Sequence, residues 1–273
     1  MSVYKKHGII IRILYLIWSM TGYFLTIGCW LGCKKTVVLC YHGVVPAHRE
    51  YFRRQILQVN SQRLGVNKSS KTKSSGAFRL PEVYITFDDA FANLLDFALP
   101  LLNELCIPAS IFAVPGNCGQ TPKWNISREH AEYNETLMTA QQLQNIQSDL
   151  ITIGSHTQTH SDLSKLLPDQ VRWELVESKK NLEKILGKPV EDLALPHGTY
   201  NDNVLRIAQE VGYKRIFTLE PRPSTSLESG AIGRFSMSPD VWPIEFYLTC
   251  VGAYAWLFPF RRLLKKVLRR TAR

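Results

Sequence analysis

Two adjacent carboxylates follow an apolar run of the sequence, where a buried strand is expected to end. The run ITF (85–87) stops at Asp88 and Asp89. A single aspartate after a strand commonly caps the helix that follows, but a cap uses one carboxylate and leaves the second unexplained. The pair therefore predicts a positively charged partner, supplied by the chain or bound to it.

Two histidines four residues apart supply a second set of candidate ligands. His156 and His160 follow another apolar run (150–154), and a helical turn would bring their Cβ atoms to about 5–6 Å. Two imidazoles and one carboxylate form a three-ligand site that leaves a position for water, as in catalytic zinc sites. One aspartate suffices as a ligand, so the other is free to act as a base. The zinc-protease motif HExxH is discounted because Thr157 stands at its glutamate position.

The elements that must position these residues alternate between strands and helices. Apolar runs predict strands at 36–45, 83–87, 109–114, 150–154, 192–195 and 214–219. Helical patterns with end signals predict helices at 93–105, 139–147, 168–186 and 202–211. The Lys- and Ser-rich stretch 66–79 is expected to be a surface loop. This alternation predicts a parallel sheet with helices outside it, whose working face lies at the carboxyl ends of the strands.

Several motifs together resemble those of the polysaccharide deacetylases, a family that includes chitooligosaccharide and peptidoglycan deacetylases. The family motif TFDD stands at 86–89, and H-[ST]-x-x-H with a later leucine stands at 156–160 with Leu163. The motif P-Y-G is represented by Pro196-His197-Gly198, and CYHGV (40–44) is similar to the Tyr-His start of many members. The match runs from about residue 36 to residue 219.

This resemblance implies an α/β fold, a distorted (β/α) barrel of about seven parallel strands. It implies that Asp88 is the catalytic base and that Asp89, His156 and His160 bind a divalent metal, taken as zinc with cobalt or nickel as alternatives. The implied reaction is metal-dependent hydrolysis of an N-acetyl group of an amino sugar, which releases acetate and a free amine.

The chain departs from the family pattern at several positions. The late Leu-x-x-His motif that supplies the general acid is absent, because no histidine follows His197. Ala194 stands where an arginine would orient the base, Ala90 replaces the glycine after the aspartates, and His197 itself replaces the tyrosine of P-Y-G.

The identity of the general acid therefore stays open. His197 is taken as the first candidate, and His42, Asp240 or Asp88 acting twice are alternatives. The oxyanion is expected to be held by the metal and by a backbone N–H of the turn at 196–198, where Gly198 permits close approach.

Two functions fit these residues. The first is N-deacetylation of an N-acetylated glycan, either a polysaccharide or a lipid-linked sugar. The alternative is a catalytically impaired glycan-binding protein on the same scaffold. Retention of all four residues of the metal-and-base set favours the enzyme.

The distribution of charge speaks against a nucleic-acid partner. The formal net charge is +10, but residues 258–273 hold seven basic and no acidic residues, which leaves 10 − 7 = +3 for the rest of the chain. A nucleic-acid-binding protein would carry a basic face on the fold itself. The six cysteines form no CxxC motif and predict buried residues rather than a disulfide framework.

Both ends of the chain carry features of membrane association. Residues 13–33 hold 21 uncharged positions, enough to span a bilayer, although a helix lying on the domain surface would also explain them. Near the C-terminus a basic helix is predicted with one apolar stripe, formed by Phe260, Leu263, Leu264, Val267 and Leu268.

The sequence thus predicts a hydrophobic N-terminal helix as membrane anchor (1–33), a deacetylase-like barrel (34–245) and a basic amphipathic C-terminal helix (246–273). We expect the protein at the inner or plasma membrane, with the cytoplasmic face favoured. There it would act on a lipid-linked or nascent cell-surface glycan.

Overall fold

A computed structural model describes residues 9–26, 35–71, 80–126, 128, 131–257 and 259. In this part of the chain eight strands form one sheet in the order β7-β6-β5-β4-β3-β2-β1-β8, and every pair of neighbours is parallel. The strands are β1 Thr36–Tyr41, β2 Glu82–Phe87, β3 Ala109–Ala113, β4 Ile151–Ser155, β5 Asp192–Ala194, β6 Arg215–Phe217, β7 Gly230–Ile232 and β8 Phe235–Ser236. The predicted parallel sheet is confirmed.

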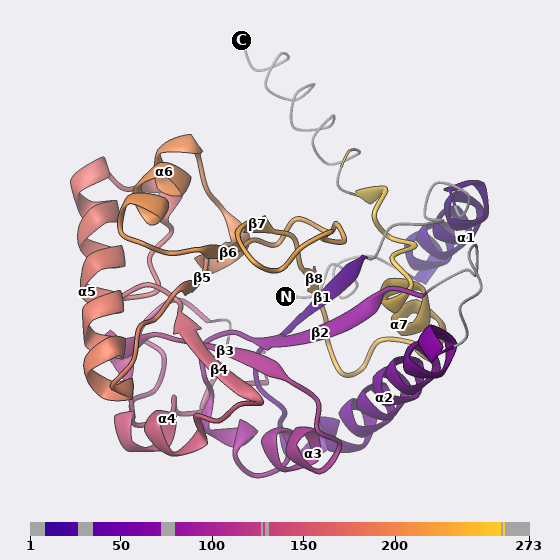
Figure 1. Ribbon diagram of the computed structural model, residues 1–273, viewed down its shortest axis with the longest axis horizontal. Helices are drawn as coiled ribbons and strands as arrows, with labels where there is room; N and C mark the ends of the chain where they lie inside the picture. Colours follow the sequence, from indigo (N-terminus) through magenta and orange to yellow (C-terminus); the bar gives the residue numbers. More distant parts are fainter. Residues whose placement is uncertain are drawn as a thin grey trace.

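Helices cover the outer side of this curved sheet (Figure 1). The described helices are α1 Ile9–Thr26, α2 Arg49–Lys71, α3 Ala98–Glu104, α4 Ala140–Ile146, α5 Pro168–Leu186, α6 Asp202–Glu210 and α7 Pro243–Cys250. Crossover helices between parallel strands pack back onto the sheet in this way. Since β7 and β8 are the two edges of the strand order, the sheet is an open half-barrel, and the predicted distorted (β/α) barrel is confirmed in this form.

The sheet is buried on both faces, which explains its nearly continuous apolar strands. All five residues of β3 are buried. On one face a large cluster joins the strands to the surrounding helices. Inside the curve a smaller cluster fills the half-barrel, made of Val38, Phe112, Ala194, Phe217 and Ile232. This packing supports the strand ends that carry the candidate site.

Local signals set the helix ends. Helix α5 begins at Pro168, whose fixed φ suits a first helical position, and ends before Gly187, which has a φ of 68°. Asn201 precedes α6 and its side chain accepts a hydrogen bond from the N–H of Val204 at 3.0 Å. The predicted bounds of both helices agree with the structure to within one residue.

Two predictions about local structure were wrong. Residues 66–71 were expected to be a loop, but helix α2 continues through them to Lys71. Once a helix is nucleated, each further residue adds a hydrogen bond, so polar residues are tolerated beyond its packed part. The helix predicted at 93–105 is divided into a 3₁₀ turn, Ala92–Leu94, and the shorter helix α3.

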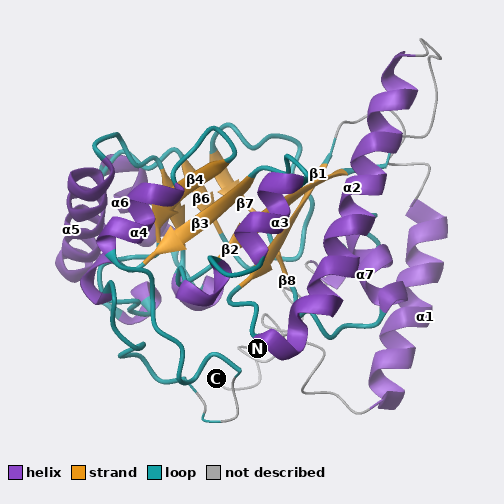
Figure 2. Cartoon of the chain, turned by 90° about the horizontal axis from the view of Figure 1, so that it is seen from below, coloured by secondary structure: helices purple, strands orange, loops and turns teal. Residues whose placement is uncertain are grey.

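The N-terminal helix α1 lies at the outside of the molecule and packs against α7 (Figure 2). In the described part of the chain, no helix combines the length and the apolar character needed to cross a bilayer. Helix α7 crosses the predicted domain boundary at 245/246. Most of the predicted basic C-terminal helix lies outside the described residues, and the three-part division of the chain stays a prediction.

Candidate metal centre

The two aspartates lie directly beyond the carboxyl end of β2. The N–H of Asp88 donates to the carbonyl of Tyr41 at 2.9 Å and so continues the pairing with β1. The next two residues, Asp89 and Ala90, have φ angles of 69° and 55°. This left-handed turn directs the two carboxylates, each 3% exposed, into the same buried site. It also explains why glycine suits the position of Ala90, since an L-residue is strained there by about 1 kcal/mol.

The histidine motif follows β4 as a loop, so the prediction of a helical turn was wrong. Thr157 and His160 have φ angles of 66° and 62°, which a helix does not contain. The buried carboxylate of Glu174, on α5, holds the loop. Its Oε2 accepts from the N–H groups of Gln158 and Thr159, both at 2.9 Å, and its Oε1 accepts from the Thr159 hydroxyl at 2.5 Å. Glu174 was not identified from the sequence, because only tertiary packing brings α5 to this loop.

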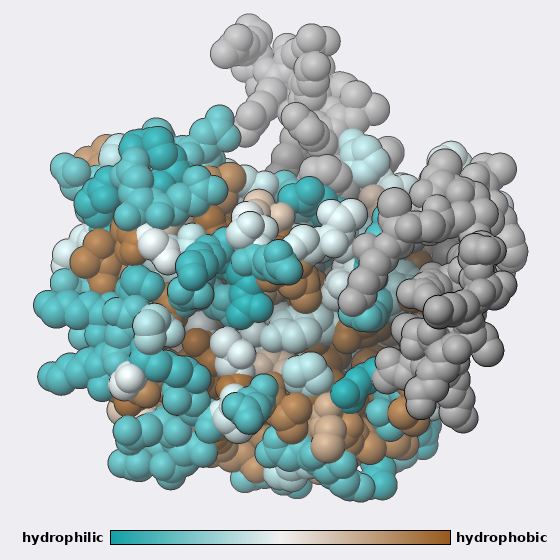
Figure 3. Space-filling model, viewed as in Figure 1, coloured by the Kyte–Doolittle hydropathy of each residue, from teal (hydrophilic) through white to brown (hydrophobic). Residues whose placement is uncertain are grey.

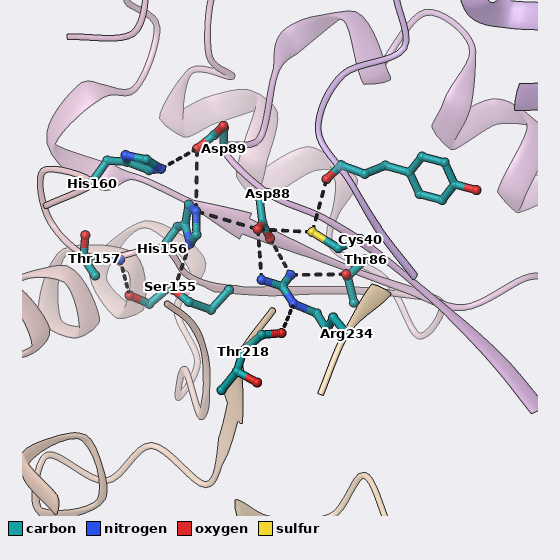
Figure 4. Close-up of polar contacts among 12 residues, drawn as sticks. Cys40, Thr86, Asp88, Asp89, Ser155, His156, Thr157, His160, Thr218 and Arg234 are labelled. Carbon is teal, nitrogen blue, oxygen red and sulfur yellow. Dashed lines mark hydrogen bonds and ion pairs between the residues drawn. The ribbon is translucent and has the colours of Figure 1, made fainter. Parts of the chain in front are cut away.

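These two segments bring the three predicted metal ligands together (Figure 4). Oδ1 of Asp89 lies 3.3 Å from Nε2 of His160 and 3.7 Å from Nε2 of His156. One candidate ligand atom from each residue lies within 4.8 Å of the other two. Within the described chain, Asp89 Oδ1 is buried without a hydrogen-bond partner. A buried carboxylate oxygen and two imidazole nitrogens that face one point form a donor set suited to a divalent cation.

Neighbouring groups orient the two imidazoles in different ways. Nδ1 of His156 lies 2.8 Å from the carbonyl of Ala194 and donates to it, which leaves Nε2 as the free lone pair toward Asp89. The ring of His160 instead stacks on Trp124, with centroids 4.2 Å apart and planes 19° apart. Trp124 was not predicted, since nothing in its local sequence marks it as a neighbour of the site.

A second missed residue, Arg234, binds the other aspartate. It precedes β8, is fully buried, and donates to Oδ1 and Oδ2 of Asp88 at 2.6 and 2.9 Å. It also donates to the hydroxyl of Thr86 and the carbonyl of Thr218, both at 3.3 Å. The orienting arginine that is missing at position 194 is therefore supplied by the connection between β7 and β8.

The electrostatics of the two aspartates differ. Burial by itself would raise the pKa of Asp88, but the Arg234 guanidinium and then His156 outweigh burial and hold that pKa well below its ordinary value. For Asp89, burial and the charges of Asp88 and Glu132 together raise the pKa well above its ordinary value. Arg234 thus stabilises Asp88 as a carboxylate. The ionised form of Asp89 would be stabilised by a further cation.

Both candidate ligand histidines have lowered pKa values. Burial, followed by the neighbouring His156 and His197, lowers the pKa of His160 to about 2. Burial is also the largest cause of the lowered pKa of His156. Metal binding requires neutral imidazole, so these environments favour the protonation state of a ligand.

The candidate acids occupy different places. The exposed ring of His197 lies 5.0 Å from the ring of His160, which places it at the rim of the site. His42 follows β1 and is partly buried, and burial lowers its pKa to about 4, with Asp88 and Glu132 opposing this shift. Asp240 is exposed and accepts a hydrogen bond from Ser238.

The turn Pro196–Gly198 was expected to offer a backbone N–H to the oxyanion, and the structure leaves one such donor. The N–H of Gly198 donates to the carbonyl of Leu195 at 2.9 Å, and Pro196 has no N–H, so the turn's remaining donor is that of His197. Gly198 has a φ of 65°, and an added Cβ would lie 2.4 Å from Cβ of Leu219. The absence of a side chain at Gly198 thus makes room for Leu219.

Comparison with known proteins defines the family. The profile of the family Polysaccharide deacetylase matches residues 76–216, which is 141 of the 273 residues. The chain belongs to the polysaccharide deacetylase family. The predicted membership is confirmed.

Individual relatives are similar over part of their length. The Bacillus subtilis protein YxkH, assigned to the polysaccharide deacetylases, is 30% identical over 174 residues, which cover 63% of this chain and 55% of that protein. The poly-β-1,6-N-acetyl-D-glucosamine N-deacetylase of Staphylococcus aureus is 28% identical over 155 residues, covering 56% and 53%. The chain spans about half the length of the curated relatives it matches.

Solved structures share the fold. The deacetylase PplD of Streptococcus pyogenes, solved with acetate, superposes with a TM-score of 0.60 at 22% identity, over 80% of this chain and 99% of that one. IcaB from Ammonifex degensii gives a TM-score of 0.58 at 22% identity, over 80% and 97%. At this identity the likeness supports the fold alone.

Proposed function

We propose that this protein is a metal-dependent N-deacetylase that hydrolyses the acetamido group of an amino sugar in a glycan. The observation that carries this proposal is the convergence of Asp89, His156 and His160 beside a second carboxylate, Asp88, that Arg234 binds through both oxygens. Family membership and the names of the relatives agree with the proposed activity.

The proposed metal site uses the three ligands found together. Asp89 Oδ1 and Nε2 of each histidine would hold a divalent cation, with zinc first and cobalt or nickel as alternatives, since imidazole and carboxylate donors suit all three. When bound, such a cation supplies Lewis-acid activation of water and of the acyl carbonyl. The buried, unpartnered Oδ1 of Asp89 supports this assignment.

Asp88 is proposed as the general base. Arg234 keeps it ionised, and its Oδ2 lies 3.8 Å from Nε2 of His156, so it borders the ligand cluster without belonging to it. Asp88 would accept the proton of the attacking water while the water oxygen bonds to the acyl carbon. The carbon–nitrogen bond then breaks, acetate leaves, and the amine nitrogen takes up a proton.

His197 is proposed to deliver that proton, because its exposed ring borders the site where a leaving amine would depart. Its backbone N–H is the donor we assign to the developing oxyanion. His42, which follows the carboxyl end of β1, is the competing candidate for the acid.

The substrate is proposed to be an N-acetylated glycan. The Staphylococcus aureus relative is named for poly-β-1,6-N-acetyl-D-glucosamine, which makes oligomers of that polymer the first substrates to assay. A lipid-linked glycan is the narrower proposal, and it depends on the membrane contact argued below.

Acetate release by the purified full chain tests the proposal. After chelation and reloading with zinc, cobalt or nickel, oligomers of β-1,6-linked N-acetylglucosamine and of chitin should yield acetate and free amine in equal amounts. Asp89→Ala should lose both metal and turnover. Glycan binding without acetate release under every metal would overturn the enzyme and support the alternative, a binding protein on the deacetylase scaffold.

A further inference from the structure

Helix α1 is attached to the half-barrel by its polar side. Arg12 donates to both carboxylate oxygens of Glu245 on α7, at 3.2 and 2.5 Å, and its guanidinium lies 4.3 Å from the ring centre of Trp242. One and two turns further along, Tyr15 packs edge-on against Trp256, and Ser19 accepts a hydrogen bond from Trp256 Nε1 at 2.9 Å. Arg12, Tyr15 and Ser19 recur at helical spacing and form the inner face of α1.

The outer face of α1 is apolar. Relative exposures of 39% to 63% are found for Ile13, Leu14, Ile17, Trp18 and Met20. Trp18 is the most exposed of these, and one side of its ring lies toward Trp256, with the ring centres 6.1 Å apart. At 100° per residue these five positions, with Thr21, fill one continuous arc opposite the inner face. Arg12 is the single charged residue of 12–21, and it lies on the inner face.

This polarity is the reverse of an ordinary surface helix, which buries its apolar stripe and turns charges to water. Helices α5 and α6 follow the ordinary rule, and the surface over them is mainly hydrophilic (Figure 3). An arc of large apolar side chains that includes a tryptophan is typical of a helix lying in the interface of a bilayer.

The basic residues near this helix in the sequence indicate that its partner is an anionic membrane surface. Trp256, which packs against α1, is followed directly by residues 258–273, with seven basic and no acidic residues. Lys5, Lys6, Lys34 and Lys35 flank the N-terminal segment, whereas the rest of the chain is nearly balanced in charge. Basic clusters beside an apolar anchor bind anionic lipid headgroups.

We propose that the outer face of α1 (Ile13, Leu14, Ile17, Trp18 and Met20) is a docking surface for an anionic membrane, with α1 lying in the interface while it stays bound to α7. A helix that crossed the bilayer would have to separate Arg12 from Glu245. Glu245 is 1% exposed, and such a separation would leave it buried without its cation. This proposal is independent of the proposed catalytic function, and the side of the membrane stays a prediction.

Binding of the full chain to vesicles tests the docking surface. The protein should bind vesicles of phosphatidylcholine with phosphatidylglycerol and bind pure phosphatidylcholine at least about tenfold more weakly, because each basic residue near an anionic surface adds attraction. Leu14→Asp and Ile17→Asp should each lower binding to the anionic vesicles at least about tenfold. The matched control is Val176→Asp on α5, at 39% exposure, which should bind like the wild type.

Two further measurements separate this proposal from its competitors. Brominated lipids should quench tryptophan fluorescence most strongly when bromine lies near the headgroups, and this quenching should be weaker in Trp18→Phe, since Trp18 is one of six tryptophans. Wild-type binding by the two aspartate variants, no binding to anionic vesicles, or quenching at the bilayer centre would each overturn the proposal. Turnover of a soluble oligosaccharide should be unchanged in Ile17→Asp, so failure of membrane docking and failure of the catalytic function remain distinguishable.

Discussion

Arg234 donates hydrogen bonds to both carboxylate oxygens of Asp88, although 146 residues separate them in the sequence. Both side chains are buried, and Arg234 also contacts the inner core, with its guanidinium 5.4 Å from the ring centre of Phe112. A residue of the short connection between β7 and β8 thus fixes the aspartate that follows β2. The position that carries the orienting arginine in the family pattern is Ala194, whose carbonyl here accepts from His156 instead.

Replacing Arg234 with methionine should shift the pH dependence of activity to higher pH. Without the guanidinium, burial dominates and the pKa of Asp88 rises, so the carboxylate is ionised only at higher pH. The acidic limb of kcat/KM should move to higher pH, and the free energy of unfolding should fall by about 3–5 kcal/mol because a buried charge loses its partner.

The double variant Asp88→Asn with Arg234→Met provides the control for stability. Because it removes both charges, it should be more stable than Arg234→Met alone. An unshifted acidic limb in Arg234→Met would show that Asp88 is not the group that Arg234 activates.

Glu174 should act as a positioning residue for the histidine loop. In Glu174→Ala three donors of Gln158 and Thr159 lose their acceptor, and metal affinity measured by titration should fall about 10–100-fold. Glu174→Gln should recover part of the affinity, because one amide oxygen can still accept from both N–H groups. Glu177→Ala, on the same helix, is the matched control and should bind metal normally. Equal affinities in Glu174→Ala and the wild type would contradict this role.

Ala90→Gly should stabilise the protein. With a φ of 55°, Ala90 occupies a left-handed conformation that costs an L-residue about 1 kcal/mol, and glycine relieves that strain. A rise of up to about 1 kcal/mol in the free energy of unfolding by denaturant is expected. Ala208→Gly, buried inside α6, should instead destabilise by about 1 kcal/mol or more. A loss of stability in Ala90→Gly would contradict the prediction, because the burial of the Ala90 methyl group would then outweigh the relief of strain.

Substitution of the two candidate acids should distinguish them. His197→Ala is expected to lower kcat by about 10²–10⁴-fold with a smaller change in KM, because protonation of the leaving amine is a transition-state contribution. His42→Ala should lower kcat less. The opposite order in steady-state kinetics would transfer the role to His42.

Local patterns predicted the parts of the fold that depend on nearby residues. The apolar runs, the helix stop at Gly187 and the short motifs located strands β1 to β6, helix α5 and the three candidate ligands, whereas the short strands β7 and β8 were not predicted. Helix α2 was not among the predicted helices, and its last turns, predicted as a loop, contain Lys, Ser and Asn rather than an apolar stripe.

The supporting residues of the site could not be predicted in the same way. Arg234, Glu174 and Trp124 lie far in sequence from the groups they contact, and only the curvature of the sheet and the packing of α5 bring them together. The two histidines converge through left-handed loop residues, a geometry that their i, i+4 spacing does not reveal.

Metal content and acetate release, measured together on Asp88→Asn and on the wild type, decide whether Asp88 is the base beside a bound metal. We expect one equivalent of zinc in both proteins, acetate release from N-acetylglucosamine oligomers by the reloaded wild type, and none by Asp88→Asn. The amide cannot accept a proton from water, yet it leaves Asp89, His156 and His160 in place. Acetate release by Asp88→Asn at the wild-type rate, or by chelated wild-type protein, would contradict the assignment of base and metal to this site.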